Sequence, residues 1–125
     1  MTITASTAQI GGTPVQSGSR TLKTTPNITA ASPTGTAIDV TGDDVALTLI
    51  NTGALDNAAS LALQAQINGS SFFPVLINGT AKVWTGAQIN AGVCETVRVK
   101  AAQIRFVLTP GTTTGTNGVI ARVLD

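Results

Sequence analysis

The chain has 125 residues, of which 42% are hydrophobic, 10% charged and 3% aromatic, and seven basic and six acidic residues leave a formal charge of +1. This length suits one domain with a single core. The near-neutral charge argues against a nucleic-acid partner, because binding requires several phosphates to be neutralised. The chain has no His or Tyr, and only one Cys and one Glu. Since acid–base and nucleophilic catalysis depend mostly on such side chains, we expect a protein that is not an enzyme and uses no cofactor.

The sequence carries no targeting signal that we recognise. Residues 2–7 have neither the basic nor the apolar segment of a secretory signal peptide. No run of about 18 apolar residues is present, so we expect no membrane partner and synthesis in a cytoplasm. Cys94 has no second cysteine to pair with, and no Cys/His cluster has zinc-binding spacing. Burial and backbone hydrogen bonds must therefore hold the fold together.

Residues 1–35 differ in composition from the rest of the chain. Thr, Ser and Gly dominate, and Pro14, Pro26 and Pro33 interrupt any helix or central strand. We predict an extended N-terminal arm whose scattered apolar residues are buried only against a neighbouring subunit. A disordered tail and an ordinary first strand are the alternatives. The apolar residues assigned to this interface are Ile3, Ile10, Val15, Leu22 and Ile28.

Residues 36–125 consist of short apolar and β-branched runs separated by Gly, Asn and Pro, which is typical of β-strands. Alternation is clearest in two of these runs. The side chains expected to face the core are Val45, Leu47 and Leu49 in the first, and Leu61, Leu63, Ala65 and Ile67 in the second. A helix over residues 54–65 is the competing prediction for the second run, because Ala, Leu and Gln favour helices. The predicted strands are 36–41, 45–52, 60–67, 71–77, 81–85, 93–100, 103–109 and 117–124.

Asn68-Gly69 and Asn78-Gly79 each separate two apolar runs. Both dipeptides predict a two-residue hairpin turn, since Asn-Gly readily supplies the positive φ angles that such a turn requires. Short strands about ten residues apart, without a long helix, predict an all-β fold, namely an antiparallel β-sandwich of jelly-roll type. The predicted organisation is an arm over residues 1–35 and a sandwich domain over residues 36–125.

The acidic residues Asp39, Asp43 and Asp44 lie close together beside Gly42, a composition that can bind calcium. Their spacing fits no EF-hand loop. We favour the simpler interpretation that the carboxylates cap turn amides, and we expect no metal site.

The few aromatic residues have two interpretations. Trp84, Phe72 and Phe73 can form a platform that stacks on sugars, but a chain this poor in aromatics needs them to fill its centre. We therefore favour packing, and we place Phe106 in the core. Cys94 has no cationic neighbour that would favour a thiolate, so we expect an inert, partly buried side chain.

Charge is distributed unevenly along the chain. Only acids occur between residues 23 and 82, whereas arginines gather in the C-terminal strands. We predict two faces of opposite sign through which copies of the subunit or a scaffold dock, with ordinary solvated strand faces as the alternative. The residues assigned to these faces are Asp43, Asp44, Arg98, Arg105 and Arg122.

The C-terminal stretch combines an Ala-x-Ile-Arg-hydrophobic strand within residues 97–109, a Gly/Thr-rich loop and a final strand at residues 118–123. It resembles the closing strands of small β-sandwich proteins of tailed-phage virions, over roughly a third of the chain. Together with the polar arm, it is similar to capsid decoration or cement proteins. The resemblance implies a jelly-roll-like sandwich, a homo-oligomer and binding across seams between major capsid proteins. It carries over no catalytic residues.

We therefore expect a virion structural protein that decorates or cements an assembled phage head. Its expected partners are the major capsid protein and copies of itself, and its expected location is the virion, assembled in the host cytoplasm. The alternatives are a tail, neck or fibre component, and a carbohydrate-binding module that uses Trp84.

Overall fold

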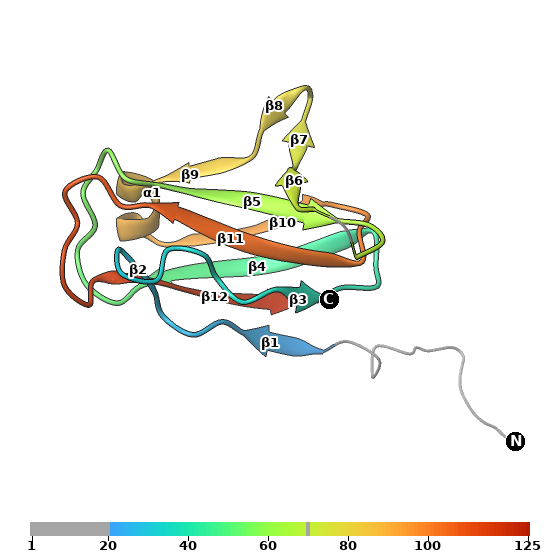
Figure 1. The fold of residues 1–125 in the computed structure, drawn as a ribbon, viewed down its shortest axis with the longest axis horizontal. Coiled ribbons are helices and arrows are strands. Elements are labelled where there is room, and N and C mark those ends of the chain that lie inside the picture. Colours follow the sequence, from blue (N-terminus) through green and yellow to red (C-terminus); the bar gives the residue numbers. More distant parts are fainter. Residues whose placement is uncertain (1–20, 70) are drawn as a thin grey trace, which may run out of the picture.

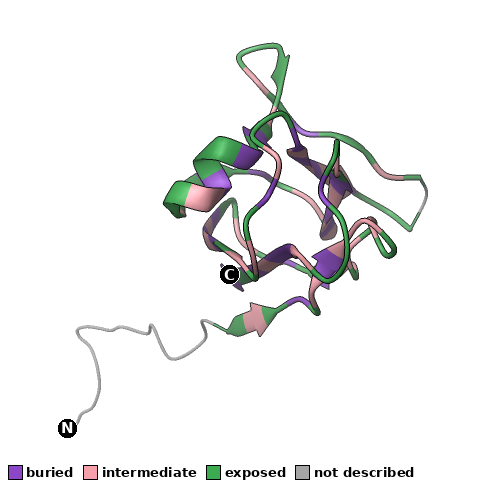
Figure 2. Ribbon diagram, turned by 90° about the vertical axis from the view of Figure 1, so that its left-hand side faces the viewer, coloured by how far each residue is buried: buried purple, intermediate pink, exposed green. Residues whose placement is uncertain are grey.

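The structure, a computed structural model, describes residues 21–69 and 71–125. Two antiparallel sheets pack against each other around one hydrophobic core (Figure 1). Viewed along the strands, the buried residues lie mainly within the strands of the two layers, whereas the outlying loops and the projecting hairpin are mostly exposed (Figure 2). The predicted all-β sandwich is confirmed. Ile3, Ile10 and Val15 of the predicted arm lie outside the described residues.

Each sheet contains strands from both halves of the chain. The first sheet is formed, in order, by β1 (Leu22–Thr24), β12 (Gly118–Leu124), β4 (Asp44–Asn51) and β10 (Val93–Arg98), with β2 (Ile28–Thr29) also on β12. The second is formed by β3 (Ile38–Asp39), β11 (Gln103–Thr109), β5 (Ser60–Gln66) and β6 (Phe73–Pro74), with β9 (Val83–Thr85) also on β5. The remaining elements are the hairpin of β7 (Leu76–Ile77) and β8 (Thr80–Ala81), and the helix α1 (Gly86–Ala91).

The antiparallel pairs are nested within one another along the chain. β1 pairs with β12, β3 with β11, β4 with β10, and β5 with β9, from the outermost pair to the innermost. Two further pairings, β12 with β4 and β11 with β5, join these pairs into the two sheets. The two ends of the described chain therefore lie beside each other, and β12 also lies beside β4.

The core is built from alternate residues of the long strands, because successive side chains of a strand point to opposite faces. Val45, Leu47 and Leu49 of β4 are all buried, as predicted. Phe106 of β11 is fully buried, which confirms its expected place, and its ring centroid lies 6.1 Å from that of Trp84. Burial of each such side chain contributes about 1.5–3 kcal/mol.

The strand predicted at residues 60–67 is confirmed as β5, and the competing helix is wrong. Its alternation, however, ends early: Ile67 is 75% exposed, and Gln66 is buried instead. The pairing of β5 with β11 stops at Gln66, opposite Gln103. Because the chain leaves the sheet at that point, the next side chain no longer follows the strand pattern.

The two Asn-Gly dipeptides behave differently. Asn78 and Gly79 have φ angles of 53° and 80° and connect β7 to β8, which confirms the predicted hairpin turn. Gly69 has a φ of 83°, but Asn68 has no positive φ. Residues 66–72 connect the last pair of β5 and β6, so the prediction of a two-residue turn at Asn68-Gly69 is wrong.

Residues 21–35, predicted to belong to the arm, are part of the sandwich. β1 and β2 both pair with β12, and Thr34 forms a bridge to Val107. Ile28 is 1% exposed within the chain's own core, whereas Leu22 is 62% exposed on β1. Short strands at a sheet edge tolerate neighbouring prolines, because their outer backbone donors need no partner strand. The predicted boundary at residue 35 is therefore too late.

Candidate protein-binding surface

Large apolar side chains are exposed on one part of the molecule. Residues 71–83 include the edge strand β6 and the first residue of β9, which both pair with β5, and the hairpin β7–β8 between them projects beyond the sandwich (Figure 1). We call residues 71–83 the projecting segment. Phe73 is 64% exposed, Leu76 60% and Val83 41%, and the neighbouring Ile67 is 75% exposed. These are four of the six exposed large hydrophobic residues of the described chain. Apolar side chains gathered in this way indicate a surface that another molecule covers.

A groove of about 450 Å³ lies beside the projecting segment. Phe73 and Ile67 line it together with Val75 and Val99, and Lys100 adds an ammonium group that is largely exposed. An apolar concave surface with a charged group beside it suits an apolar side chain of a partner protein.

Backbone hydrogen bonds fix the base of the projecting segment to β5. Val75 N donates to Leu63 O at 3.0 Å, and Lys82 O accepts from Leu63 N at 3.1 Å. Val75 O in turn accepts from Lys82 N at 2.8 Å. Val75 is 8% exposed and belongs to the core. The apolar side chains beyond this point therefore stand on an anchored support.

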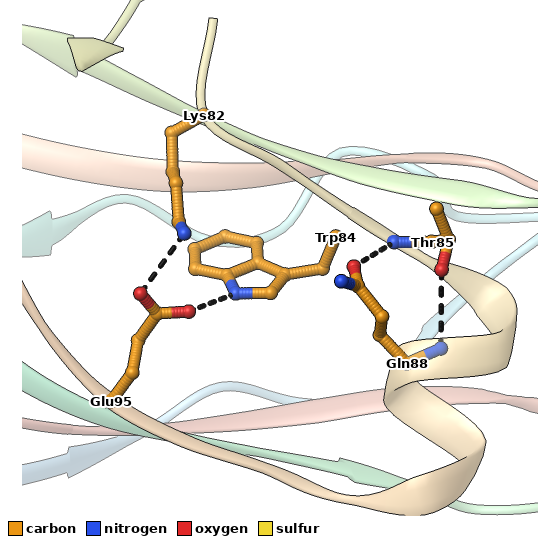
Figure 3. Close-up of polar contacts among 5 residues, drawn as sticks. All are labelled: Lys82, Trp84, Thr85, Gln88 and Glu95. Carbon is orange, nitrogen blue, oxygen red and sulfur yellow. Dashed lines mark hydrogen bonds and ion pairs between the residues drawn. The ribbon is translucent and has the colours of Figure 1, made fainter. Parts of the chain in front are cut away.

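A polar network ties the same base to the opposite sheet (Figure 3). Glu95 of β10 accepts a hydrogen bond from Trp84 Nε1 at 2.6 Å and one from Lys82 Nζ at 2.9 Å. The Lys82 ammonium also lies 5.0 Å from the centroid of the Trp84 ring. Trp84 is 2% exposed, so its indole N–H requires the acceptor that Glu95 supplies.

Glu95 is held in its ionised form. Partial burial by itself would raise the pKa of its carboxyl group. The hydrogen bonds from Trp84 and Lys82, with the charge of Lys82, outweigh this and lower the pKa below the ordinary value of 4.5. Because both carboxylate oxygens are engaged and charged at neutral pH, this arrangement suits a connection between sheets rather than proton transfer.

The helix α1 follows Trp84 directly and was not expected from the sequence. Thr85 Oγ1 accepts from Gln88 N at 3.1 Å, while Gln88 Oε1 accepts from Thr85 N at 2.9 Å (Figure 3). This capping box begins the helix, and Gly92 ends it with a φ of 93°. The Thr-x-x-Gln spacing followed by Gly is the signal in the sequence that could have revealed it.

The aromatic residues lie in different environments. Trp84 is buried, which confirms the packing interpretation and removes it from any exposed sugar platform. Phe72 lies under the guanidinium of Arg105, whose central carbon is 4.2 Å from the ring centroid. Phe73 alone of the three is mostly exposed. Cys94, expected to be partly buried, is exposed, because alternate residues of β10 point away from the core.

The acidic and basic residues that were predicted to form two opposite faces lie close to one another in the structure. Arg98 of β10 lies opposite Asp44 of β4, and Lys100 Nζ is 3.9 Å from Asp43 Oδ1. The cause is antiparallel pairing, which brings the start of β4 beside the end of β10. Arg122 is exposed on β12, and Arg105 belongs to the other sheet. The assigned residues therefore do not form two faces of opposite sign.

The acidic cluster is divided as well. Asp39 lies on β3 and accepts a hydrogen bond from Gln103 Nε2 at 2.7 Å, whereas Asp44 is the first residue of β4 and Asp43 directly precedes it. Within the part of the chain that the structure describes, no three His, Cys, Asp or Glu side chains are placed to hold a metal ion. No helix in that part is long and apolar enough to span a membrane.

The function has to be inferred from this surface. The exposed apolar residues, the groove and the anchored base together make up the candidate surface. Comparison of the chain with protein-family models, with curated proteins and with solved structures finds no match.

Proposed function

We propose that the protein is a virion structural protein that decorates or cements an assembled phage head, and that it is not an enzyme. The observation that carries this proposal is the anchored projecting segment with its exposed Phe73 and Leu76. Apolar side chains on a fixed support gain free energy when another protein surface covers them, and little is lost in ordering them. The proposed partners are the major capsid protein and further copies of this chain.

The expected strength of the contact follows from the exposed side chains. Burial of Phe73 and Leu76 against a partner supplies about 1.5–3 kcal/mol each. A protein that binds only the assembled shell adds its binding free energy to the stability of that shell at every occupied site. Many weak contacts of this kind stabilise a large particle without any chemical step.

We further propose that the sandwich is a jelly roll. The nested pairs β1–β12, β3–β11, β4–β10 and β5–β9 support this, because an antiparallel hairpin of four such pairs gives a jelly roll when it rolls up. The pairings of β12 with β4 and of β11 with β5 are the contacts that rolling creates. Such a sandwich offers a rigid body on which a short hairpin can project.

The proposal is tested with heads assembled without this protein. We expect the wild-type protein to sediment with these heads and to raise their melting temperature, and we expect a Phe73→Ser/Leu76→Ser variant to do neither. Ile50→Ser is the control, because Ile50 is an exposed apolar residue of β4 that lies outside both the projecting segment and the predicted arm. Unchanged binding of the double variant would show that the projecting segment does not contact the head. Failure of the wild-type protein to bind, with electron micrographs placing it on a tail or on no particle, would contradict the proposed function.

A further inference from the structure

Asn-Gly occurs three times in the chain, and the structure describes the neighbouring residues on both sides of two of these pairs, Asn78-Gly79 and Asn117-Gly118. This dipeptide can react with itself, because glycine has no Cβ to hinder its own main-chain nitrogen. That nitrogen can attack Cγ of the preceding asparagine. The two pairs are chemically identical, so their surroundings decide whether the reaction takes place.

The surroundings of Asn117-Gly118 hold both reacting groups in place. Asn117 Nδ2 donates to Ala54 O at 3.0 Å, and Gly118 N donates to Thr52 Oγ1 at 3.0 Å. Gly118 is buried as the first residue of β12. A Cβ added at Gly53 would overlap the Asn117 amide, so this amide packs closely against the backbone. The amide and the Gly118 nitrogen therefore cannot turn toward each other unless these contacts break.

Asn78-Gly79 has no such restraints among the described residues. Both residues are exposed at the turn between β7 and β8. No hydrogen bond between described residues engages the Asn78 amide or the Gly79 N–H. Apart from its chain neighbours, no described atom lies within 4 Å of the position that a Cβ of Gly79 would take. Since β7 and β8 pair at only two positions, the turn can open without disturbing the sandwich.

We propose that Asn78 is a site of spontaneous deamidation in the folded protein, and that Asn117 is protected. Gly79 N attacks Cγ of Asn78, the new N–Cγ bond closes a succinimide ring, and the Cγ–Nδ2 bond breaks. Ammonia leaves with the proton that Gly79 N loses. Water then opens the ring at one of two carbonyl carbons. Attack at Cγ gives aspartate, and attack at the main-chain carbonyl gives isoaspartate.

The modification changes the tip of the projecting segment. Either product places a carboxylate two residues from Leu76, whose side chain is 60% exposed. Isoaspartate also adds a carbon atom to the main chain within a turn whose positive φ angles suit a two-residue connection. The lengthened turn no longer fits the pairing of β7 with β8. This chemistry concerns the chain alone, so the proposal does not depend on the proposed function.

The test is incubation of the full folded chain in mildly alkaline buffer, followed by peptide mass spectrometry with fragmentation. We expect residue 78 to change from amide to acid at least roughly tenfold faster than residue 117, because Asn117 reacts only when its contacts open. An isoaspartyl methyltransferase with a labelled methyl donor should label residue 78. Retention of the Asn78 amide, equal rates at the two residues, or aspartate without isoaspartate would overturn the proposal.

Two controls separate the effect of the structure from that of the sequence. In urea, where the chain is unfolded, we expect both asparagines to react at similar rates. If Asn117 were equally slow in urea, the neighbouring residues in the sequence would be the cause, and the proposed protection would be wrong. Thr52→Val removes the acceptor of the Gly118 N–H at similar volume, so Asn117 should react faster in this variant while Asn78 keeps its wild-type rate.

Discussion

At the scale of single residues, Glu95 is the side chain on which most of the described polar structure around Trp84 depends. It accepts the indole N–H of a fully covered Trp84 and pairs with Lys82, which belongs to the base of the projecting segment. Glu95 comes from β10, in the sheet opposite β9. One carboxylate therefore connects the two layers of the sandwich at the point where the projecting segment begins.

We predict that Glu95→Ala lowers the free energy of unfolding by about 1–3 kcal/mol, because it leaves a buried N–H without an acceptor. Cys94→Ala, at the adjacent exposed position, is the control and should change it by less than about 0.5 kcal/mol. Urea unfolding followed by tryptophan fluorescence measures both. Similar effects of the two substitutions would mean that the hydrogen bond to Trp84 contributes little.

The contribution of the Glu95 carboxylate can also be measured from the pH dependence of the free energy of unfolding. The pKa of Glu95 is lower in the folded protein than in the unfolded chain, so the folded state binds fewer protons in acid. Its contribution to stability is complete above the ordinary pKa of 4.5 and disappears as the pH falls through the lowered value. Glu95→Gln should accordingly show a flatter loss of stability in acid than the wild-type protein.

At the scale of elements, β2 decides whether residues 21–35 belong to the sandwich. Ile28 of β2 is buried by its own chain, so we predict that Ile28→Ala lowers the free energy of unfolding by about 2–5 kcal/mol. Leu22→Ala on the exposed side of β1 should cost less than about 0.5 kcal/mol. Measurement at low protein concentration excludes a contribution from association. If Ile28→Ala lowered the free energy of unfolding only at high protein concentration, Ile28 would instead be buried against a neighbouring subunit.

Strands were predictable where their own residues repeat the pattern of a half-buried sheet. β4 and β11 alternate over their whole length, so their positions and the burial of Phe106 follow from the sequence. β1 and β2 contain too few apolar residues for a pattern. Their pairing depends on β12, which lies about 90 residues away from β2 and about 100 from β1 along the chain. A strand that forms only because it pairs with a distant segment cannot be predicted from its own few residues.

The candidate surface was less predictable than the fold for a related reason. Phe73 and Phe106 are chemically identical, and only the three-dimensional structure places the first in solvent and the second in the core. Phe106 lies within an alternating strand, whereas Phe73 lies in β6, an edge strand of two residues that are both exposed. Glu95 attracted attention as the only glutamate, but its contact with Trp84 crosses between sheets and has no sequence signature.

At the scale of the whole molecule, a sandwich with a buried core carries three of the six exposed large apolar side chains of the described chain, Phe73, Leu76 and Val83, on the projecting segment. The strands at both ends of the described chain, β1 and β12, pair with each other in the first sheet, and the hairpin β7–β8 extends from the sandwich (Figures 1 and 2). This arrangement, a buried core with exposed apolar side chains on the projecting segment, supports the proposed role of contact with other proteins.

Covalent labelling of side chains, read by mass spectrometry in the free protein and in intact virions, tests this role most directly. The account predicts that Phe73 and Leu76 are labelled freely in the isolated protein and become protected in the particle. Ile50, an exposed apolar residue of β4 outside the projecting segment and the predicted arm, serves as the internal reference. Equal labelling of Phe73 and Leu76 in both states would contradict the claim that the protein works through this surface.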